Sequence, residues 1–225
     1  MTDAPTMVAA IVLFPNVTLL DAVGPYEALW RVPGLRTHMV GPDLEPIVGG
    51  GGALLQPTAT FQDLPTPDVL LVPGGPGTNA AQSDPVLLEY LRSAAAGVTW
   101  LASVCSGSLV LGAAGLIDGR RASTYWLSRD DLGAMGVDVS SERVTVDGNL
   151  ITAAGVSAGI DLGLRLAALL SDDHTGAAIQ LAMEYAPEPP FDIGPNDAAP
   201  ADLVARYQEL RAGWFTPPTT EEKIP

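Results

Sequence analysis

Short runs of apolar residues, each long enough for one buried strand, recur along the chain and constrain its fold more than any other feature. The clearest runs are Met7–Phe14, Asp68–Val72 and Val98–Val104. Continuous rather than alternating apolar runs are typical of strands that are covered on both faces, as in parallel sheets. Helix-like segments such as Leu19–Val32 and Ala158–Leu170 lie between or after them. This alternation predicts an α/β fold, flavodoxin-like, with a mainly parallel sheet sandwiched by helices.

Turn and cap residues place the remaining elements. Asp84 and Pro85 form an N-cap followed by a first-turn proline, so a helix is expected to begin there. Asp147-Gly148-Asn149 predicts a hairpin turn, and the four glycines of Gly49–Gly52 indicate an irregular hairpin or a flap. No repeat or linker divides the 225 residues. A single domain over residues 1–225 is therefore expected, with residues 213–225 as a C-terminal tail.

Composition and charge narrow the class of partner. The chain has 26 acidic and 11 basic residues, for a net charge of −15, which disfavours binding to nucleic acid or to an anionic membrane. No apolar stretch approaches the roughly 18 residues of a spanning helix, and no basic region precedes the first apolar run. One cysteine excludes an intrachain disulfide framework and suits a reducing compartment. A cytoplasmic location is expected.

The one cysteine, Cys105, lies between the buried strand Val98–Val104 and the helix-like segment Ser106–Leu116. A sharp strand-to-helix turn presents a side chain above the sheet edge, as in a nucleophile elbow. The amides of the following helix are expected to favour the thiolate and so to depress the pKa of Cys105. The alternative is a buried structural cysteine, because free cysteine is among the most buried residue types.

Further candidate site residues lie where other strands end, and they meet Cys105 if the strands at Met7–Phe14, Asp68–Val72 and Val98–Val104 are neighbours. Asp21 stands among apolar residues, so its pKa is expected to be raised and it can carry a proton, unless it only caps a helix. Gly74 and Gly75 can offer amides to a developing anion or simply form a tight turn. Gly155 is grouped with them as a substrate- or oxyanion-binding candidate. Ser106 can hydrogen-bond the thiolate or serve as an N-cap.

Other chemistries find little support. His38 and His174 adjoin neither Cys105 nor an evident acidic partner, so both are expected to be structural or exposed, and a Cys-His hydrolase lacks its base. One cysteine and two separated histidines make a poor metal set, and no phosphate loop is present, so neither a metal nor a cofactor is expected. Asp161, inside a helical pattern, is expected to be a structural hydrogen-bonding residue.

From about Met7 to Ala212 the chain resembles the ThiJ/PfpI superfamily of flavodoxin-like proteins, and within it the isocyanide hydratases. The resemblance is carried by five segments: LFPNVTLLDAVGPYE (Leu13–Glu27), LLVPGGPGT (Leu70–Thr78), SVCSGSLVLGAAGLIDGRRAST (Ser103–Thr124), RVTVDGNLITAAGVSAGID (Arg143–Asp161) and MEYAPEPPFDIGP (Met183–Pro195).

The resemblance implies a homodimer in which Cys105 is the nucleophile, Asp21 the acid and Ser106 a hydrogen-bonding neighbour. It also implies an isocyanide substrate that gains water and becomes an N-substituted formamide by way of a thioimidate, with no cofactor. Two departures are visible. Tyr125 stands where relatives usually carry histidine, and Ser106 stands where protease-like members place histidine, which argues against peptidase activity.

Two alternatives remain open. The same domain is the ligand-sensing half of AraC-type transcription regulators, which continue into a helix-turn-helix domain; a chain that ends at Pro225 is expected to lack that DNA reader. The other alternative is a glyoxalase-type stress-response member that acts on carbonyl compounds with the same cysteine and a carboxylate.

Overall fold

The structure is a computed structural model that describes residues 7–193 and 196–214. The chain divides into two compact units, Met1–Ala186 and Pro187–Pro225, where the sequence indicated one domain. The second unit contains the helix α8 (Ala201–Trp214). Apart from residues 213 and 214, the predicted tail lies outside the described residues. All candidate site residues belong to the first unit.

A seven-stranded sheet forms the centre of the first unit, in the order β10-β11-β7-β6-β1-β2-β5. All neighbouring strands run parallel except β10 and β11, which form the antiparallel hairpin predicted at Asp147-Gly148-Asn149. The mainly parallel α/β fold is thus confirmed. The strands are β1 (Met7–Val12), β2 (Leu35–Gly41), β5 (Ala59–Thr60), β6 (Val69–Val72), β7 (Trp100–Val104), β10 (Val144–Asp147) and β11 (Leu150–Ala153).

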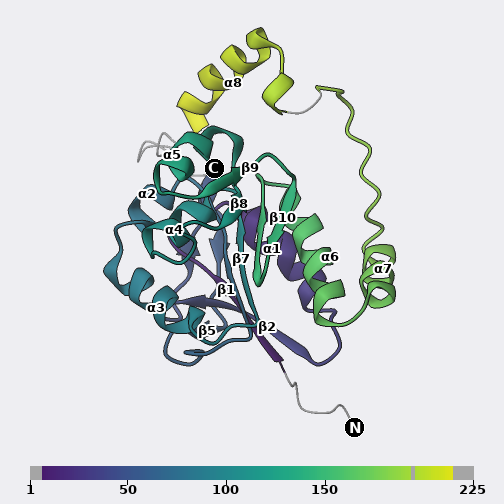
Figure 1. The fold of residues 1–225 in the computed structure, drawn as a ribbon. Helices are drawn as coiled ribbons and strands as arrows, with labels where there is room; N and C mark the ends of the chain where they lie inside the picture. Colours follow the sequence, from purple (N-terminus) through teal and green to yellow (C-terminus); the bar gives the residue numbers. More distant parts are fainter. Residues whose placement is uncertain (1–6, 194–195, 215–225) are drawn as a thin grey trace, which may run out of the picture. The chain divides into compact units, whose positions relative to one another are not determined.

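Helices cover both faces of this sheet (Figure 1). On one face lie α1 (Leu19–Leu29), α6 (Ala158–Leu170) and α7 (Asp173–Ala182). On the other lie α2 (Thr78–Ala81), α3 (Pro85–Ala95), α4 (Gly107–Ala113) and α5 (Arg129–Ala134). Because β1, β6 and β7 are buried on both sides, their side chains need no polar face, which is why their apolar runs are continuous.

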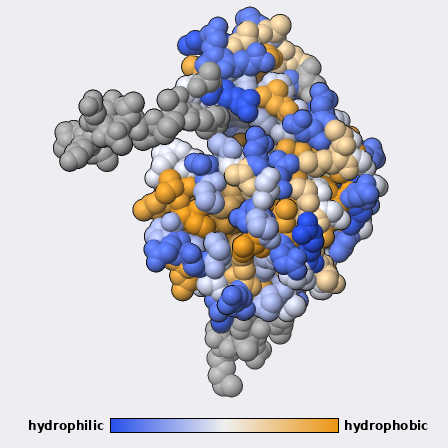
Figure 2. Space-filling model, turned by 90° about the vertical axis from the view of Figure 1, so that its left-hand side faces the viewer, coloured by the Kyte–Doolittle hydropathy of each residue, from blue (hydrophilic) through white to orange (hydrophobic). Residues whose placement is uncertain are grey.

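The helix starts follow the cap signals of the sequence. Asp84 Oδ1 accepts the backbone N–H groups of Val86 and Leu87 at 2.9 and 3.2 Å, and Pro85 occupies the first turn of α3. Leu87 and Leu91 of α3 are buried against the sheet. The face of the molecule in Figure 2 shows hydrophilic and hydrophobic residues interspersed.

The two helices α1 and α6 pack closely through small residues. A Cβ added at Gly163 would stand 2.8 Å from Pro25 Cα and 3.1 Å from Ala28 Cβ, so the backbones approach where no side chain intervenes. This contact fixes α1, whose first turn carries Asp21.

Two short strand pairs lie outside the main sheet. β3 (Ile47–Val48) and β4 (Leu54–Leu55) pair across the glycines of residues 49–52, as the sequence indicated. β8 (Arg121–Ser123) pairs in parallel with β9 (Asp138–Ser140). Among the described residues, no helix combines the length and the apolar character that crossing a membrane requires.

Candidate active site

Cys105 occupies a constrained turn between β7 and α4. Its backbone has a φ of 58°, the left-handed region that residues with a side chain rarely adopt. Its N–H donates to the carbonyl oxygens of Ala153 and Ala154 at 3.1 and 3.2 Å. Its own carbonyl oxygen accepts the hydroxyl of Thr124 at 3.1 Å and that of Ser108 at 3.4 Å. Because the backbone N–H and C=O groups of Cys105 are both hydrogen-bonded, the turn fixes the direction in which its side chain leaves the backbone.

Asp21 lies in the first turn of α1 with 0% of its surface exposed. Its Oδ2 accepts the Gly74 N–H at 3.1 Å, while its Oδ1 is buried and has no hydrogen-bond partner within the described part of the chain. Burial raises the pKa of Asp21 to about 7, against the smaller opposing effects of the Gly74 amide and the Cys105 thiol. The raised pKa expected from the apolar neighbourhood is confirmed.

The thiol of Cys105 is 5% exposed. Burial is the largest cause that raises its pKa well above the usual value, and the charge of Asp21 raises it further; the Ser106 amide and hydroxyl act in the opposite direction. The expected depression of the thiol pKa is therefore wrong. Desolvation in the interior outweighs the amides at the start of α4, a helix of only seven residues.

Ser106 connects the cysteine turn to the loop after β6. Its Oγ accepts the Gly75 N–H at 3.1 Å and lies 2.8 Å from the hydroxyl oxygen of Thr78. It makes no side-chain cap for α4. The amides of Gly74 and Gly75, candidates for binding an anion, thus donate within the site to the carboxyl of Asp21 and the hydroxyl of Ser106.

The three loops predicted to meet do so, because β1, β6 and β7 are adjacent in the sheet. The Thr18 N–H donates to the Gly74 carbonyl at 2.9 Å, which joins the loop after β1 to the loop after β6. Gly75, with a φ of 142°, permits this close approach: an added Cβ would collide with the backbone of Thr18 and of Asn16.

A fourth loop, between β11 and α6, brings Gly155 to the cysteine. The position that a Cβ on Gly155 would take is 3.5 Å from Cys105 Sγ and 2.5 Å from Cδ2 of Tyr125. Gly155 therefore leaves the space that the Tyr125 ring occupies beside the thiol. Its part in binding a substrate stays a prediction.

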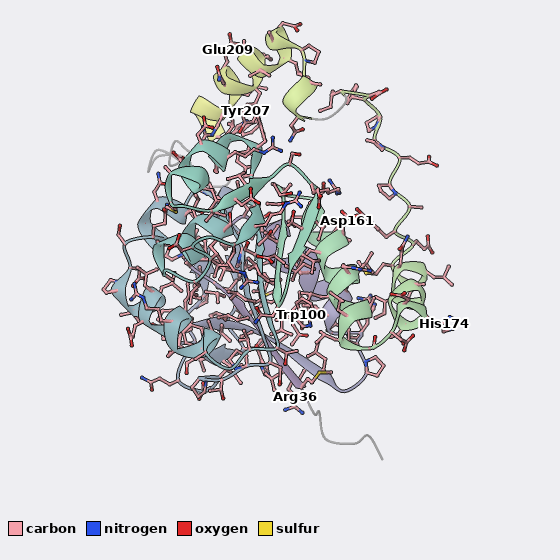
Figure 3. The ribbon with its side chains drawn as sticks, in the orientation of Figure 1. Arg36, Trp100, Asp161, His174, Tyr207 and Glu209 are labelled. Atoms are coloured by element: carbon pink, nitrogen blue, oxygen red, sulfur yellow. The ribbon has the colours of Figure 1, made fainter. Side chains whose placement is uncertain are left out.

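The histidines lie apart from the cysteine. Nδ1 of His38 on β2 is 3.1 Å from the Thr58 hydroxyl oxygen, and His174 is exposed on α7, at the outer side of that helix in Figure 3. Asp161 pairs with Arg143 at 2.6 Å and accepts the Tyr185 hydroxyl at 3.2 Å, so its structural role is confirmed. Within residues 7–193 and 196–214, no three His, Cys, Asp or Glu side chains group as metal ligands.

Two polar residues of the site were not anticipated. Thr78 holds Ser106, and Thr124 holds the carbonyl of Cys105. Both lie at the ends of segments that stood out in the sequence, but a threonine carries no local signal of such a distant contact. Only the adjacency of the loops reveals them.

Close backbone contact makes Gly107 irreplaceable. A Cβ there would collide with the carbonyl oxygen of Val72 and would stand 2.7 Å from that of Pro73. We expect Gly107→Ala to lower the free energy of unfolding by about 3 kcal/mol or more. The control, Gly133→Ala in α5, would make only an ordinary 3.6 Å contact with Val139. That variant should be neutral or up to about 1 kcal/mol more stable.

Urea unfolding of both variants measures this difference. A Gly107→Ala protein with the unfolding midpoint of the Gly133→Ala protein would contradict the close-contact explanation. The same curves report whether the fold survives, because the slope with denaturant follows the surface exposed on unfolding.

Comparison with known proteins supports the same architecture. The chain is 47% identical to an isonitrile hydratase of Pseudomonas putida, over 89% of this chain and 88% of the relative. It is 31% identical to the HTH-type transcriptional regulator CdhR of Pseudomonas aeruginosa, over 69% of this chain and 48% of the regulator. The crystal structure of a ThiJ/PfpI family protein from Pseudomonas syringae superimposes with a TM-score of 0.87 at 39% identity, covering 95% of this chain and 90% of that chain. The DJ-1/PfpI family matches residues 7–169, so the resemblance is confirmed and the chain belongs to the DJ-1/PfpI family.

Proposed function

We propose that this protein is an isocyanide hydratase, which adds water to an isocyanide, R–N≡C, and releases an N-substituted formamide. Isonitrile is another name for isocyanide, and the relative from Pseudomonas putida is named for this activity. One structural observation carries the proposal. The carboxyl of Asp21 is fully buried beside the Cys105 thiol, and its Oδ1 has no hydrogen-bond partner among the described residues.

The pair of Asp21 and Cys105 fits an isocyanide because two bonds form at one atom of this substrate. Its terminal carbon accepts both a nucleophile and a proton, so the proton donor must lie beside the nucleophile. Asp21 carboxylate takes the proton from Cys105 Sγ, the sulfur bonds to the terminal carbon, and Asp21 delivers the proton to that same carbon. The product of this step is a thioimidate, R–N=CH–S–Cys105, and the carboxylate of Asp21 is restored.

Hydrolysis completes the cycle with the same two residues. Asp21 takes a proton from water as the oxygen bonds to the thioimidate carbon, and it passes that proton to the nitrogen. The carbon–sulfur bond of this tetrahedral intermediate then breaks, which releases R–NH–CHO, and the proton of its hydroxyl group passes through Asp21 to the Cys105 sulfur. Ser106, held by the Gly75 amide and by Thr78, lies next to the sulfur and supports its negative charge in both steps.

Incubation of the purified protein with para-nitrophenyl isocyanide tests the proposal. We expect each isocyanide consumed to yield one N-(4-nitrophenyl)formamide, measured by chromatography against a standard. Methylglyoxal in a parallel reaction should not be consumed. Turnover of methylglyoxal without turnover of the isocyanide would reject hydratase activity in favour of the glyoxalase-type alternative.

The pH profile tests the proton transfer. A carboxylate is needed to take the proton from the thiol, and the pKa of Asp21 is about 7. We therefore expect kcat/KM to rise about tenfold per pH unit below pH 7 and to level off above it. The observed midpoint belongs to the coupled pair of Asp21 and Cys105 rather than to either residue alone. A profile that is flat between pH 5 and 8 would contradict this assignment.

Ligand sensing is the second candidate function. The similarity to CdhR, a transcriptional regulator, covers 69% of this chain and favours it. A sensor would bind an isocyanide or related ligand without turnover. The assay above separates the hydratase from the sensor, because formation of many formamide molecules per protein molecule excludes a role limited to binding.

We also infer a homodimer and a cytoplasmic location without nucleic-acid partners. The dimer rests on the family resemblance. The net charge of −15 opposes binding to a phosphate backbone. The single cysteine accords with a reducing compartment.

A further inference from the structure

Tyr125 lies beside the Cys105 thiol, held there by the residue before it and by the packing of its own ring. The preceding residue, Thr124, donates its hydroxyl to the Cys105 carbonyl at 3.1 Å. The ring itself fills the space in front of Gly155. The position of a Cβ on Gly155 would be 2.5 Å from Cδ2 and 3.2 Å from Cε2 of the ring, and 3.5 Å from Cys105 Sγ. One edge of the Tyr125 ring and the sulfur thus border the same point in space.

The ring is held in this place but is only partly buried. It packs edge-on against Trp126, with ring centroids 6.2 Å apart and planes at 65°. Tyr125 is intermediate in exposure, whereas Thr124 is 1% exposed and Cys105 is 5% exposed. A molecule that reaches the sulfur along this side therefore meets an aromatic ring whose position is set by its neighbours.

An isocyanide is linear from its terminal carbon through nitrogen to the first atom of the organic group. When the terminal carbon contacts Cys105 Sγ, the organic group lies two bonds farther out, among the residues that surround the thiol. We infer that Tyr125 determines specificity by contacting this organic group, and that it favours a flat aromatic isocyanide over a saturated one of equal ring size. The inference rests on the proposed hydratase function.

The preference has a physical basis. Two aromatic rings attract in offset-stacked or edge-to-face arrangements beyond the effect of the area that they bury, and a saturated ring lacks this interaction. The usual strength of such a pair corresponds to about a three- to tenfold change in kcat/KM. The ring, rather than the hydroxyl, should carry the effect, because its Cδ2 and Cε2 atoms face the point shared with the sulfur.

Phenyl isocyanide and cyclohexyl isocyanide, tested with three proteins, measure this preference. We expect Tyr125→Leu to lower the phenyl-to-cyclohexyl ratio of kcat/KM about three- to tenfold. Tyr125→Phe should keep the ratio within about twofold of the unaltered protein. An unchanged ratio in Tyr125→Leu would overturn the inference. An equal loss in both variants would also overturn it, because the hydroxyl would then be responsible.

A second readout does not depend on hydratase activity. N-phenyliodoacetamide and N-cyclohexyliodoacetamide alkylate thiols, and the chain has one cysteine, so intact mass reports modification of Cys105 alone. The phenyl-to-cyclohexyl ratio of alkylation rates should fall in Tyr125→Leu and persist in Tyr125→Phe. If the unaltered protein hydrates neither isocyanide, the proposed function fails while this ratio still decides the role of Tyr125: a fall only in the leucine variant supports it, and no change overturns it.

Discussion

We expect replacement of Cys105 with serine to abolish isocyanide turnover, lowering kcat by about four orders of magnitude or more. A hydroxyl has nearly the shape of the thiol but ionises far less readily, and no histidine adjoins it as a base. Asp21 is the neighbouring proton acceptor, and with its pKa of about 7 it cannot efficiently deprotonate an alcohol. Steady-state assays with para-nitrophenyl isocyanide measure the loss.

The serine variant also separates chemistry from folding. The backbone of residue 105 is held by Ala153, Ala154 and Thr124 regardless of its side chain. We therefore expect its thermal unfolding midpoint to stay close to that of the unaltered protein. A folded serine variant that retains a tenth of the turnover would refute Cys105 as the nucleophile.

We expect Asp21→Asn to reduce turnover and to increase stability at the same time. Without a carboxylate the thiol proton has no acceptor, so kcat/KM should fall about 10²- to 10⁴-fold. The matched control is Asp161→Asn, which alters an acid in the first turn of α6 that pairs with Arg143. That variant should retain turnover within about threefold. Loss of activity in both variants would indicate general damage and contradict a specific role for Asp21.

The expected stability gain follows from the raised pKa of Asp21. The group titrates at about 7 in the folded protein and near 3.8 in the unfolded chain, so between these values the folded state holds the additional proton. The free energy of unfolding therefore decreases as pH rises from about 4 to 7 and levels off above that. Asparagine carries no charge, so it removes this penalty, which amounts to at most about 4 kcal/mol at pH 8.

Urea unfolding of the Asp21→Asn and unaltered proteins at pH 5 and pH 8 tests this sign. The stability difference between the two proteins should be larger at pH 8. An asparagine variant that is less stable at pH 8 than at pH 5, by as much as the unaltered protein, would show that Asp21 is not the titrating group.

The fold was accessible from the sequence because its central strands are buried on both faces. The continuous apolar runs identified β1, β6 and β7, and the parallel order then placed their carboxyl ends together. Helix starts were accessible where a capping side chain marks them, as at Asp84. The helix expected to reach Val32 instead ends at Leu29, since nothing in its last turn signals the stop.

The sequence predicted that the candidate residues lie together, but it predicted their electrostatics less well. The residue types at strand ends identified Asp21, Cys105 and Ser106, and the apolar neighbours of Asp21 indicated its raised pKa. The predicted lowering of the Cys105 pKa was wrong because the local sequence shows the amides of the following helix but not how deeply the turn is buried. The Gly74 amide donates to Asp21, which lies 53 positions earlier in the chain, and no local sequence pattern reveals so distant a contact.

The glycines of the site divide it into two parts with different freedom to evolve. Around Gly75 and Gly107, main chain lies against main chain, and almost any substitution there would disrupt the fold and the reaction together. Around Gly155, the neighbour is a side chain, the ring of Tyr125. If Tyr125 contacts the organic group of the substrate, as inferred above, we expect substrate preference to change by exchange of residue 125 while Asp21 and Cys105 stay the same.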